Sequence, residues 1–475
     1  MAKLIGHGLS FTEQKPHASH KLGKGKPTMH VLIVGGGIGG LAAALSLHAA
    51  GIGSTVFEQV RKPAELGVGI NILPHAIKEL ADLGLLPTLD RAGIRTRELV
   101  YANRFGQVVW REPRGTDAGL DTPQFSIHRG KLHTVLLDAV RERLGADALQ
   151  TGHRLISFTE RGDRVEARFE RRDGGEIIAV DGDALVGADG IHSTARAVFY
   201  PGEGAPVWNG TVLWRGAADW PVYIDGRTMV IAGGMAAKFV FYPIHFDPAS
   251  PARRLTNWAV MARVGDASGG PPRREDWNRP GEWSEVEPFV CDRFRLDFVN
   301  PLALIEASGT FYEYPLCDRD PLPRWSFGRA TLLGDAAHPM YPVGSNGASQ
   351  AVLDARSLAR HLAAGAPVPD ALAAYDAERR PMTAEIVLNN RKGGPERVID
   401  VLEERAPDGF SDVDAIASHA EREAIVRGYA SMAGFAREQV NRSLAIVNDK
   451  SCWADVLTSK GRPLKVGRPL NRLHG

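Results

Sequence analysis

Three glycines near the start of the chain stand in the order Gly35-x-Gly37-x-x-Gly40, after a β-branched run and before a segment with helical spacing. Glycines at these places permit a tight turn, let the backbone approach a pyrophosphate, and allow close packing of helix on strand. The helix start offers free N–H groups and a positive dipole end to phosphate. Together with Ile38 and Gly39, these glycines predict a dinucleotide site. A glycine-rich turn that packs and binds nothing is the alternative.

An acidic residue at the end of the next predicted strand strengthens this prediction. Glu58 closes the run Ser54–Glu58, where a carboxylate can accept hydrogen bonds from an adenosine ribose. The neighbouring Gln59 is predicted to belong to the same site. NAD and FAD share this fingerprint, so these residues leave the choice of cofactor open.

Two later motifs, Asp189-Gly190 and Gly334-Asp335, bear on that choice, and each directly follows an apolar run typical of a buried strand. An aspartate at the end of a strand can accept hydrogen bonds from ribityl hydroxyls. The segment Gly344–Ala348 then opens a predicted helix, whose N–H groups could face the pyrimidine edge of a flavin. Any one motif could be a structural turn, but their order predicts FAD. The predicted contacts are Asp189, Gly190, Gly334, Asp335, Gly344, Gly347 and Ala348.

These motifs resemble those of the FAD-dependent aromatic hydroxylases, the class A flavoprotein monooxygenases that include p-hydroxybenzoate and salicylate hydroxylases. The resemblance covers nearly the whole body of the chain. In that family the DG motif, matched here by Asp189-Gly190 with Arg196, is linked to both FAD and NAD(P)H. The segment His128–Leu132 resembles the one in which an arginine contacts the flavin, which implies Arg129 as a further flavin contact.

The resemblance implies an activity as well as a cofactor. Such enzymes use NADH or NADPH as a transient co-substrate to reduce FAD. They then hydroxylate a small aromatic or N-heteroaromatic molecule with O2 through a flavin C4a-hydroperoxide. The run Gly344–Ala351 is most similar to the branch of phenazine-1-carboxylate-type monooxygenases. The sequence has no second Gly-x-Gly-x-x-Gly fingerprint and no metal-ligand cluster, so a separate NAD(P)H domain and a metal are not expected.

Two other functions remain open from the sequence. An FAD-linked reductase or dehydrogenase of the same fold would never transfer oxygen to its substrate. A Rab-escort-like binding protein also carries this fold, but the intact GD motif at Gly334-Asp335 argues against it.

The substrate ring is expected between the flavin and the aromatic-rich middle of the chain, where short strands alternate with turns. The pocket candidates are Trp214, Arg215, Phe239, Phe241, Tyr242, Met340, Tyr341 and Pro342. Each aromatic residue of the middle segment could instead pack in the core. Arg215 could pair with a substrate carboxylate or form a surface ion pair. His338 could stabilise its loop or carry a proton, and no side chain is assigned as catalytic.

Positioning these motifs requires an α/β fold with a discontinuous Rossmann-like FAD-binding domain, an inserted and mainly antiparallel substrate sheet, and a C-terminal helical region. The predicted FAD-binding domain comprises residues 29–107, 128–200 and 315–394. The other predicted parts are a flexible extension (1–28), the substrate domain (108–127 and 201–314) and the C-terminal helical region (395–475). Helical spacing is found over 131–144, 347–362, 368–392 and 412–447.

Composition excludes several classes of protein. The 475 residues are 44% hydrophobic and 24% charged with a net charge of +1, which is typical of globular and not of disordered chains. Residues 1–28 hold five lysines and one glutamate, so the remainder is mildly acidic and does not indicate nucleic-acid binding. Three scattered cysteines indicate reduced thiols in a cytoplasm. No segment predicts a signal peptide or a membrane span, and a monomer or homodimer is expected.

Overall fold

The computed structural model describes residues 29–62, 68–267, 270–273, 276 and 278–443. The predicted extension 1–28 and the last part of the predicted C-terminal region, 444–475, lie outside the described residues. In the part of the chain that is described, no helix combines the length and the apolar character needed to cross a bilayer.

A five-stranded parallel sheet forms the base of the molecule. Its order is β18-β12-β1-β2-β8. Its strands are His30–Val34 (β1), Gly53–Glu58 (β2), Leu149–Thr151 (β8), Ala184–Gly187 (β12) and Ala330–Leu332 (β18). β1, β12 and β18 are short apolar runs that are almost fully buried, as strands covered on both faces require. Three segments far apart in the sequence meet in this sheet, which confirms the predicted discontinuous Rossmann-like domain.

Helices α1 (Ile38–Ala49), α4 (Arg129–Leu144), α8 (Gly347–Ala363) and α9 (Val368–Arg391) pack with this sheet in one apolar core. α1 contacts both α4 and α8, and α8 contacts α9. The α1 residues Gly40–Leu47 are all buried. This is possible because α1 carries small or apolar residues on all of its faces. The helices predicted at α4, α8 and α9 are confirmed, with small shifts at their ends.

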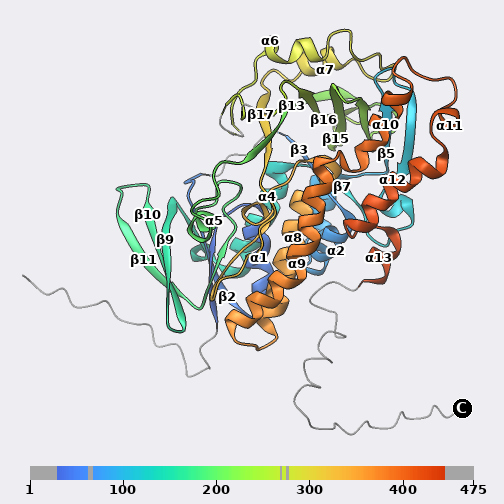
Figure 1. The fold of residues 1–475 in the computed structure, drawn as a ribbon. Coiled ribbons are helices and arrows are strands. Elements are labelled where there is room, and N and C mark those ends of the chain that lie inside the picture. Colours follow the sequence, from blue (N-terminus) through green and yellow to red (C-terminus); the bar gives the residue numbers. More distant parts are fainter. Residues whose placement is uncertain (1–28, 63–67, 268–269, 274–275, 277, 444–475) are drawn as a thin grey trace, which may run out of the picture.

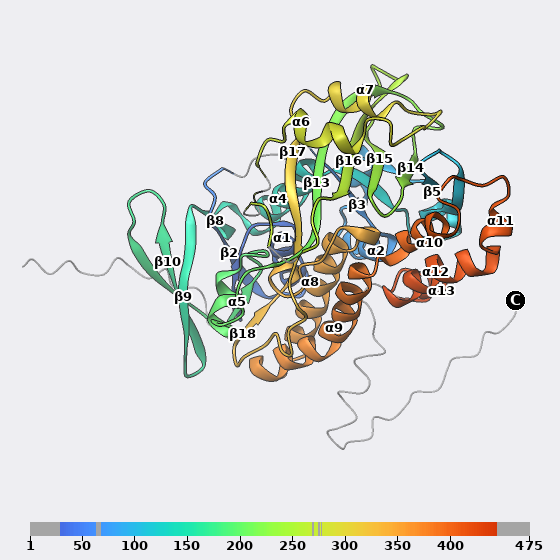
Figure 2. The ribbon, with the colours of Figure 1, turned by 45° about the horizontal axis from the view of Figure 1, so that its top comes forward.

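Two small antiparallel sheets flank the parallel one. The strands β9 (His153–Arg161), β10 (Arg164–Arg171) and β11 (Ile177–Gly182) form a sheet that projects from the body on the side opposite to the C-terminal helices (Figure 2). The second sheet has the order β3-β7-β4. Its strands are Gly69–Ile72 (β3), Gly93–Arg95 (β4) and Phe125–His128 (β7), and the helices nearby are α2 (Pro74–Asp82) and α3 (Leu86–Ala92).

A seven-stranded sheet with the order β17-β13-β16-β15-β14-β5-β6 forms the upper layer in Figure 1. Its strands are Glu98–Asn103 (β5), Val108–Pro113 (β6), Val207–Pro221 (β13), Thr228–Gly233 (β14), Ala237–His245 (β15), Arg253–Arg263 (β16) and Tyr312–Asp318 (β17). All neighbours are antiparallel except β14 and β5, which confirms the predicted mainly antiparallel sheet.

The structure differs from the predicted domain boundaries at two places. β5 lies in the seven-stranded sheet, although the prediction assigned residues 29–107 to the FAD-binding domain. β17 stays in the same sheet up to Asp318, although the prediction assigned residues from 315 onwards to the FAD-binding domain. The physical reason for the first difference is that β5 and β6 are the two strands of one hairpin, which a boundary at 107 divides.

The two faces of the seven-stranded sheet pack against different elements, because neighbouring residues of a strand point to opposite faces. One face carries an aromatic core that includes Trp214 and Phe241. This core packs against α6 (Trp283–Val286) and α7 (Pro301–Glu306), which lie above the sheet in Figure 1. The opposite face packs against the C-terminal helices.

The C-terminal helices lie beside β5 and β6, as the red segments in Figure 1 show. They are Arg397–Arg405 (α10), Val413–Ile416 (α11), His419–Met432 (α12) and Arg437–Arg442 (α13). Val398, Leu402 and Val426 join the core of that face. The described part of the predicted helical segment 412–447 is divided, because Ser418 caps the start of α12 and Gly434 (φ +81°) follows its end.

Candidate active site

A cavity of about 950 Å³ lies between the carboxyl ends of the parallel strands and the seven-stranded sheet. The loops after β1, β2, β12 and β18 line one side of it, and strands β5 and β13–β17 line the other. The carboxyl ends of parallel strands are the common binding place of ligands in such folds. Most predicted cofactor residues line this cavity: Gly35, Gly37, Ile38, Gly39, Glu58, Gln59, Arg129, Asp189, Gly190, Gly334, Asp335, Gly344, Gly347 and Ala348.

In the first fingerprint, Gly35 and Gly40 allow close packing of the backbone, whereas Gly37 leaves open space. Gly35 has a φ of +107°, and a Cβ on it would lie 2.3 Å from the carbonyl oxygen of Ala188. A Cβ on Gly40 would lie 1.9 Å from the carbonyl oxygen of Gly35, so this glycine serves helix–strand packing and does not line the cavity. A Cβ on Gly37 would meet no atom within 4 Å, and this position leaves room for a ligand.

Glu58 joins this loop to the end of β2. Its Oε2 accepts a hydrogen bond from the N–H of Gly36, and its Oε1 accepts one from the N–H of Val60, both at 2.7 Å. The carboxylate is therefore held in place at the cavity wall, where the sequence predicted a contact with an adenosine ribose.

The DG motif forms the loop between β12 and α5 (Thr194–Phe199). Asp189 accepts hydrogen bonds from the Ser193 hydroxyl and from the Thr194 N–H at 2.7 Å. Burial raises the pKa of Asp189, although these hydrogen bonds oppose the shift. Asp189 therefore both shapes its own loop and lines the cavity.

Arg196, which the resemblance implied as a cofactor contact, lies behind the cavity wall and not in it. Arg196 is 1% exposed, and its side chain forms an ion pair with Glu203. Its Nη1 donates to the carbonyl oxygens of Ala336 and Ala337, at 3.1 and 2.9 Å. Arg196 thus joins the DG loop to the loop of the GD motif, because its planar guanidinium can reach several acceptors at once.

The GD motif places a carboxylate opposite an arginine at the cavity. Asp335 lies in η4 (Gly334–Ala336) after β18, and Arg129 begins α4. Burial raises the pKa of Asp335, although the charges of His338 and Arg129 oppose the shift. Burial lowers the pKa of Arg129, and Asp335 opposes that shift. The two charges stabilise each other at the cavity wall.

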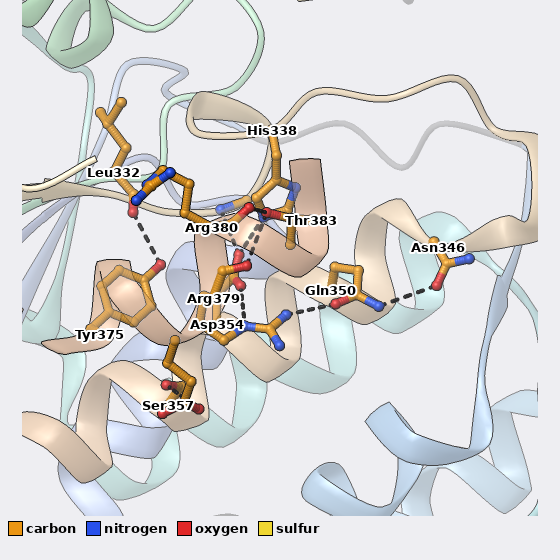
Figure 3. A network of polar contacts seen from close by, with 12 residues as sticks. Leu332, His338, Asn346, Gln350, Asp354, Ser357, Tyr375, Arg379, Arg380 and Thr383 are labelled. Atoms are coloured by element: carbon orange, nitrogen blue, oxygen red, sulfur yellow. Dashed lines mark hydrogen bonds and ion pairs between the residues drawn. The ribbon is translucent and has the colours of Figure 1, made fainter. Parts of the chain in front are cut away.

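A buried polar network lies beneath these loops (Figure 3). Asp354 of α8 accepts hydrogen bonds from the Gly334 N–H at 3.1 Å and from Arg379 Nε at 2.8 Å. His338 Nε2 lies 2.5 Å from the same carboxylate, and Arg379 Nη2 donates to Gln350 at 2.6 Å. Burial alone would raise the pKa of Asp354, but His338 and Arg379 outweigh burial and lower it. In this arrangement His338 stabilises its loop, the first of its two predicted roles.

The start of α8 is supported by the C-terminal region. Gly344 of η5 (Val343–Ser345) has a φ of +71°, and a Cβ on it would lie 2.5 Å from the Tyr429 hydroxyl. That hydroxyl donates to Asn390 at 2.7 Å and accepts from the side-chain amide of Asn346 at 2.8 Å. The C-terminal region, to which the sequence assigned no chemistry, therefore positions the predicted flavin loop.

The structure brings four of the eight pocket candidates to the cavity: Arg215, Tyr242, Met340 and Pro342. Trp214, Phe239 and Phe241 lie in the aromatic core on the opposite face of the sheet. Tyr341 is 3% exposed and packs in a small cluster with Leu213 and Tyr314. The period of two along a strand places the three core aromatics away from the cavity.

Several lining residues are absent from the sequence-based prediction. Tyr101 of β5 and Glu396 of η6 (Gly394–Glu396) line the cavity, as do Arg114 and Gln124. β5 is an unbroken apolar run from Leu99 to Ala102 that is buried throughout, so no alternation indicates which of its residues face the cavity. Glu396 has no local signal, because a turn after α9 brings it to the cavity.

Arg215 makes one part of the cavity positive. Burial, and then the charge of Arg129, lowers the pKa of Arg215. An anionic ligand group at this place would relieve the repulsion between the two guanidinium groups. Around them the wall is largely apolar, with Leu213, Ile231 and Met261 among its residues, and such a wall suits an aromatic ring.

The residues of this cavity fit FAD. The space in front of Gly37 admits a pyrophosphate beside the start of α1. Glu58, Asp189 and Asp335 succeed one another along the carboxyl ends of β2, β12 and β18. The described residues contain no group of three or more His, Cys, Asp or Glu side chains arranged for a metal.

Comparison with known proteins identifies the class. The FAD binding domain family matches residues 28–204 and 319–390. The chain is 45% identical over 365 residues to phenazine 1,6-dicarboxylic acid hydroxylase PhzS of Lysobacter antibioticus, covering 76% of this chain and 89% of that protein. It is 31% identical over 381 residues to 3-hydroxybenzoate 6-hydroxylase 1 of Aquipseudomonas alcaligenes, covering 76% and 88%. The chain therefore belongs to the FAD binding domain family of flavin-dependent aromatic hydroxylases.

Solved structures share the same fold. The structure of a variant of HpxO of Klebsiella pneumoniae with FAD has a TM-score of 0.67 at 24% identity, covering 85% of this chain and 98% of that chain. The substrate complex of a salicylate hydroxylase has a TM-score of 0.66 at 20% identity, covering 87% and 99%. These structures confirm the predicted fold, and the relatives above confirm the predicted family.

Proposed function

We propose that this chain is an FAD-dependent monooxygenase that uses NADH or NADPH and O2 to hydroxylate a small aromatic or N-heteroaromatic molecule. One observation supports this most strongly: a single cavity joins the glycine-lined FAD loops to an apolar sheet face that carries Arg215. Bound FAD supplies the redox and oxygen chemistry. The chain itself orients the ring and excludes water from the reacting atoms.

The proposed substrate is a planar aromatic carboxylate. Arg215 and Arg129 would bind the carboxylate, since a charge-assisted hydrogen bond from a guanidinium is strong where water is excluded. Apolar side chains such as Ile231 and Met261 would contact the ring faces. The names of the two relatives, a phenazine dicarboxylic acid hydroxylase and a hydroxybenzoate hydroxylase, support this class of substrate.

A substrate screen tests the proposal. Phenazine carboxylates, hydroxybenzoates and hydroxynicotinates would each be added to the purified yellow protein with NADH or NADPH. We expect at least one to stimulate NAD(P)H oxidation and to gain one oxygen atom by mass spectrometry. Stimulated oxidation without a product that gains oxygen would instead support the reductase or dehydrogenase alternative.

The same preparation decides the remaining predictions. Comparison of kcat/KM for NADH with kcat/KM for NADPH shows which of the two is the preferred electron donor. Light scattering coupled to size exclusion distinguishes the monomer from the homodimer. The cytoplasmic location stays a prediction that rests on the few scattered cysteines.

A further inference from the structure

The C-terminal region places a buried carboxylate in the cavity. Glu396 ends η6, where the chain turns through Gly393 (φ +94°) and Gly394 (φ +50°) after α9. A Cβ on Gly394 would lie 2.8 Å from the side chain of Val343, so η6 packs directly on the loop that precedes α8. Glu396 is 3% exposed and lines the cavity. It lies beyond the last residue that the family matches, residue 390.

A lysine of the seven-stranded sheet holds this carboxylate. The Nζ of Lys238 lies 3.3 Å from Glu396 Oε2 and 3.2 Å from Asp400 Oδ1. Burial raises the pKa of Glu396, Lys238 opposes the shift, and Asp400 adds to it. Glu396 lines the cavity whereas Asp400 does not. Lys238 therefore pairs with one carboxylate that lines the cavity, Glu396, and with one that lies behind the cavity wall, Asp400.

Polar side chains of β5 and of the segment after β6 lie near Glu396. The charges of Arg114 and Glu396 both act on the buried hydroxyl of Tyr101. Arg114 is 8% exposed and Gln124 is 2% exposed, and both line the cavity. Among the described residues, Arg114 Nε and Gln124 Oε1 are buried without a hydrogen-bond partner. Buried polar atoms are nearly always satisfied, so these two indicate that a polar ligand group completes the site.

The charges of this region differ from those around Arg215. Arg114 donates to Glu112 at 2.7 Å, and Lys238 pairs with Glu396 and Asp400. Each cation here has a carboxylate beside it, whereas around Arg215 a second guanidinium, that of Arg129, adds positive charge. A second carboxylate of the ligand would meet acidic groups, while a neutral hydrogen-bond donor would be stabilised by them.

We propose that Glu396 is a specificity-determining residue, which accepts a hydrogen bond from a hydroxyl or N–H group of the substrate beside Tyr101, Arg114 and Gln124. This inference rests on the proposed function, because it concerns the substrate in the same cavity. The substrate class becomes an aromatic carboxylate with a donor group on another edge of its ring system. A methyl ether in place of the hydroxyl cannot donate to this carboxylate, which is then left at the cavity with Lys238 as its partner and no ligand donor. Loss of such a hydrogen bond in a buried site is discriminated strongly.

Ligand binding to the oxidised holoenzyme tests this without turnover. 3-Hydroxybenzoate and 6-hydroxynicotinate would be titrated against their methyl ethers, and the flavin absorbance spectrum would report binding. We expect the wild-type protein to prefer the hydroxyl compound of at least one pair by about tenfold. Glu396→Gln should reduce that preference to less than about threefold, because the amide replaces the charged acceptor.

Asp400→Asn is the matched control, because it removes the other carboxylate of Lys238 and leaves the cavity wall intact. It should keep the wild-type preference.

Tyr101→Phe serves as a second variant if Glu396→Gln does not fold. This substitution keeps the ring and should lower the preference about threefold. Absence of a preference in the wild-type protein, or equal losses in Glu396→Gln and Asp400→Asn, would overturn the proposal. Since no NAD(P)H is added, failure of the monooxygenase assay would leave this result unaffected.

Discussion

The two faces of the seven-stranded sheet differ in chemistry although the same strands form both. On β13, Trp214 packs in the aromatic core while its neighbour Arg215 lines the cavity. On β15, Phe241 belongs to the core and Tyr242 to the cavity. The core face is expected to determine stability and the cavity face to determine ligand binding. Substitutions on neighbouring residues can therefore separate folding from function.

The largest effect is expected on the core face. Phe241 has no exposed surface, so Phe241→Ala should lower the free energy of unfolding by about 3–5 kcal/mol. Urea unfolding of the holoenzyme measures this loss. Phe246→Ala is the control, since Phe246 is 39% exposed and its loss should cost less than about 1 kcal/mol. Equal losses in the two variants would contradict the assignment of Phe241 to the core.

Two glycines of the first fingerprint should also separate an effect on stability from an effect on ligand binding. Gly40→Ala should destabilise the fold by about 1–3 kcal/mol, because its Cβ would lie 1.9 Å from a backbone oxygen. Gly37→Ala has open space and should keep the melting temperature of the apoprotein while weakening FAD binding. Melting curves and FAD titration of both apoproteins check this. Unchanged FAD affinity in Gly37→Ala would show that this face does not meet the cofactor.

Arg215→Met tests the cavity face directly. Loss of a charge-assisted hydrogen bond should weaken binding of 3-hydroxybenzoate about 10- to 100-fold. Stability should be unchanged or higher, because burial and Arg129 already disfavour the charged guanidinium. Flavin-monitored titration and thermal unfolding give the two numbers. Arg263→Met is the control, because Arg263 lies at an exposed end of β16, and it should change neither affinity nor stability. A loss of stability without a loss of affinity in Arg215→Met would contradict the assignment of Arg215 to ligand binding.

The smallest effect is expected where a residue belongs to neither face. Glu378 of α9 pairs with Arg360 and His361 of α8 at the surface. Burial alone would raise the pKa of Glu378, but the contacts with His361 and Arg360 lower it to about 2. Glu378→Gln should cost at most about 1 kcal/mol at pH 7. Because the folded-state pKa is below the ordinary value of 4.5, this difference should vanish as the pH falls from 4.5 towards 2. A difference that persists at pH 2 would refute the ion-pair explanation.

Local turn chemistry explains what could be predicted from the sequence. Gly35, Asp189 and Asp335 each follow a short buried strand, and this pattern indicates both the fold and the position of the residue at the cavity. The face of each aromatic residue was predictable in principle, because Trp214 and Arg215 are neighbours and cannot share one face of a strand. A count of aromatic residues that ignores this alternation places Trp214, Phe239 and Phe241 wrongly in the pocket.

Tertiary contacts explain what could not be predicted. Arg196 reaches the carbonyl oxygens of Ala336 and Ala337, which are 140 and 141 residues away. Glu396 reaches the cavity through the turn after α9 and pairs there with Lys238 of β15. Neither contact has a local sequence pattern, so a single sequence offers no signal for it.

Isotope incorporation tests the central claim most directly. The purified protein would be supplied with NAD(P)H, the best ligand of the substrate screen and ¹⁸O2 in unlabelled water. The proposed monooxygenase should produce a hydroxylated aromatic product that carries one ¹⁸O atom per molecule. A product without ¹⁸O, or NAD(P)H oxidation that yields only labelled hydrogen peroxide with every ligand, would contradict it.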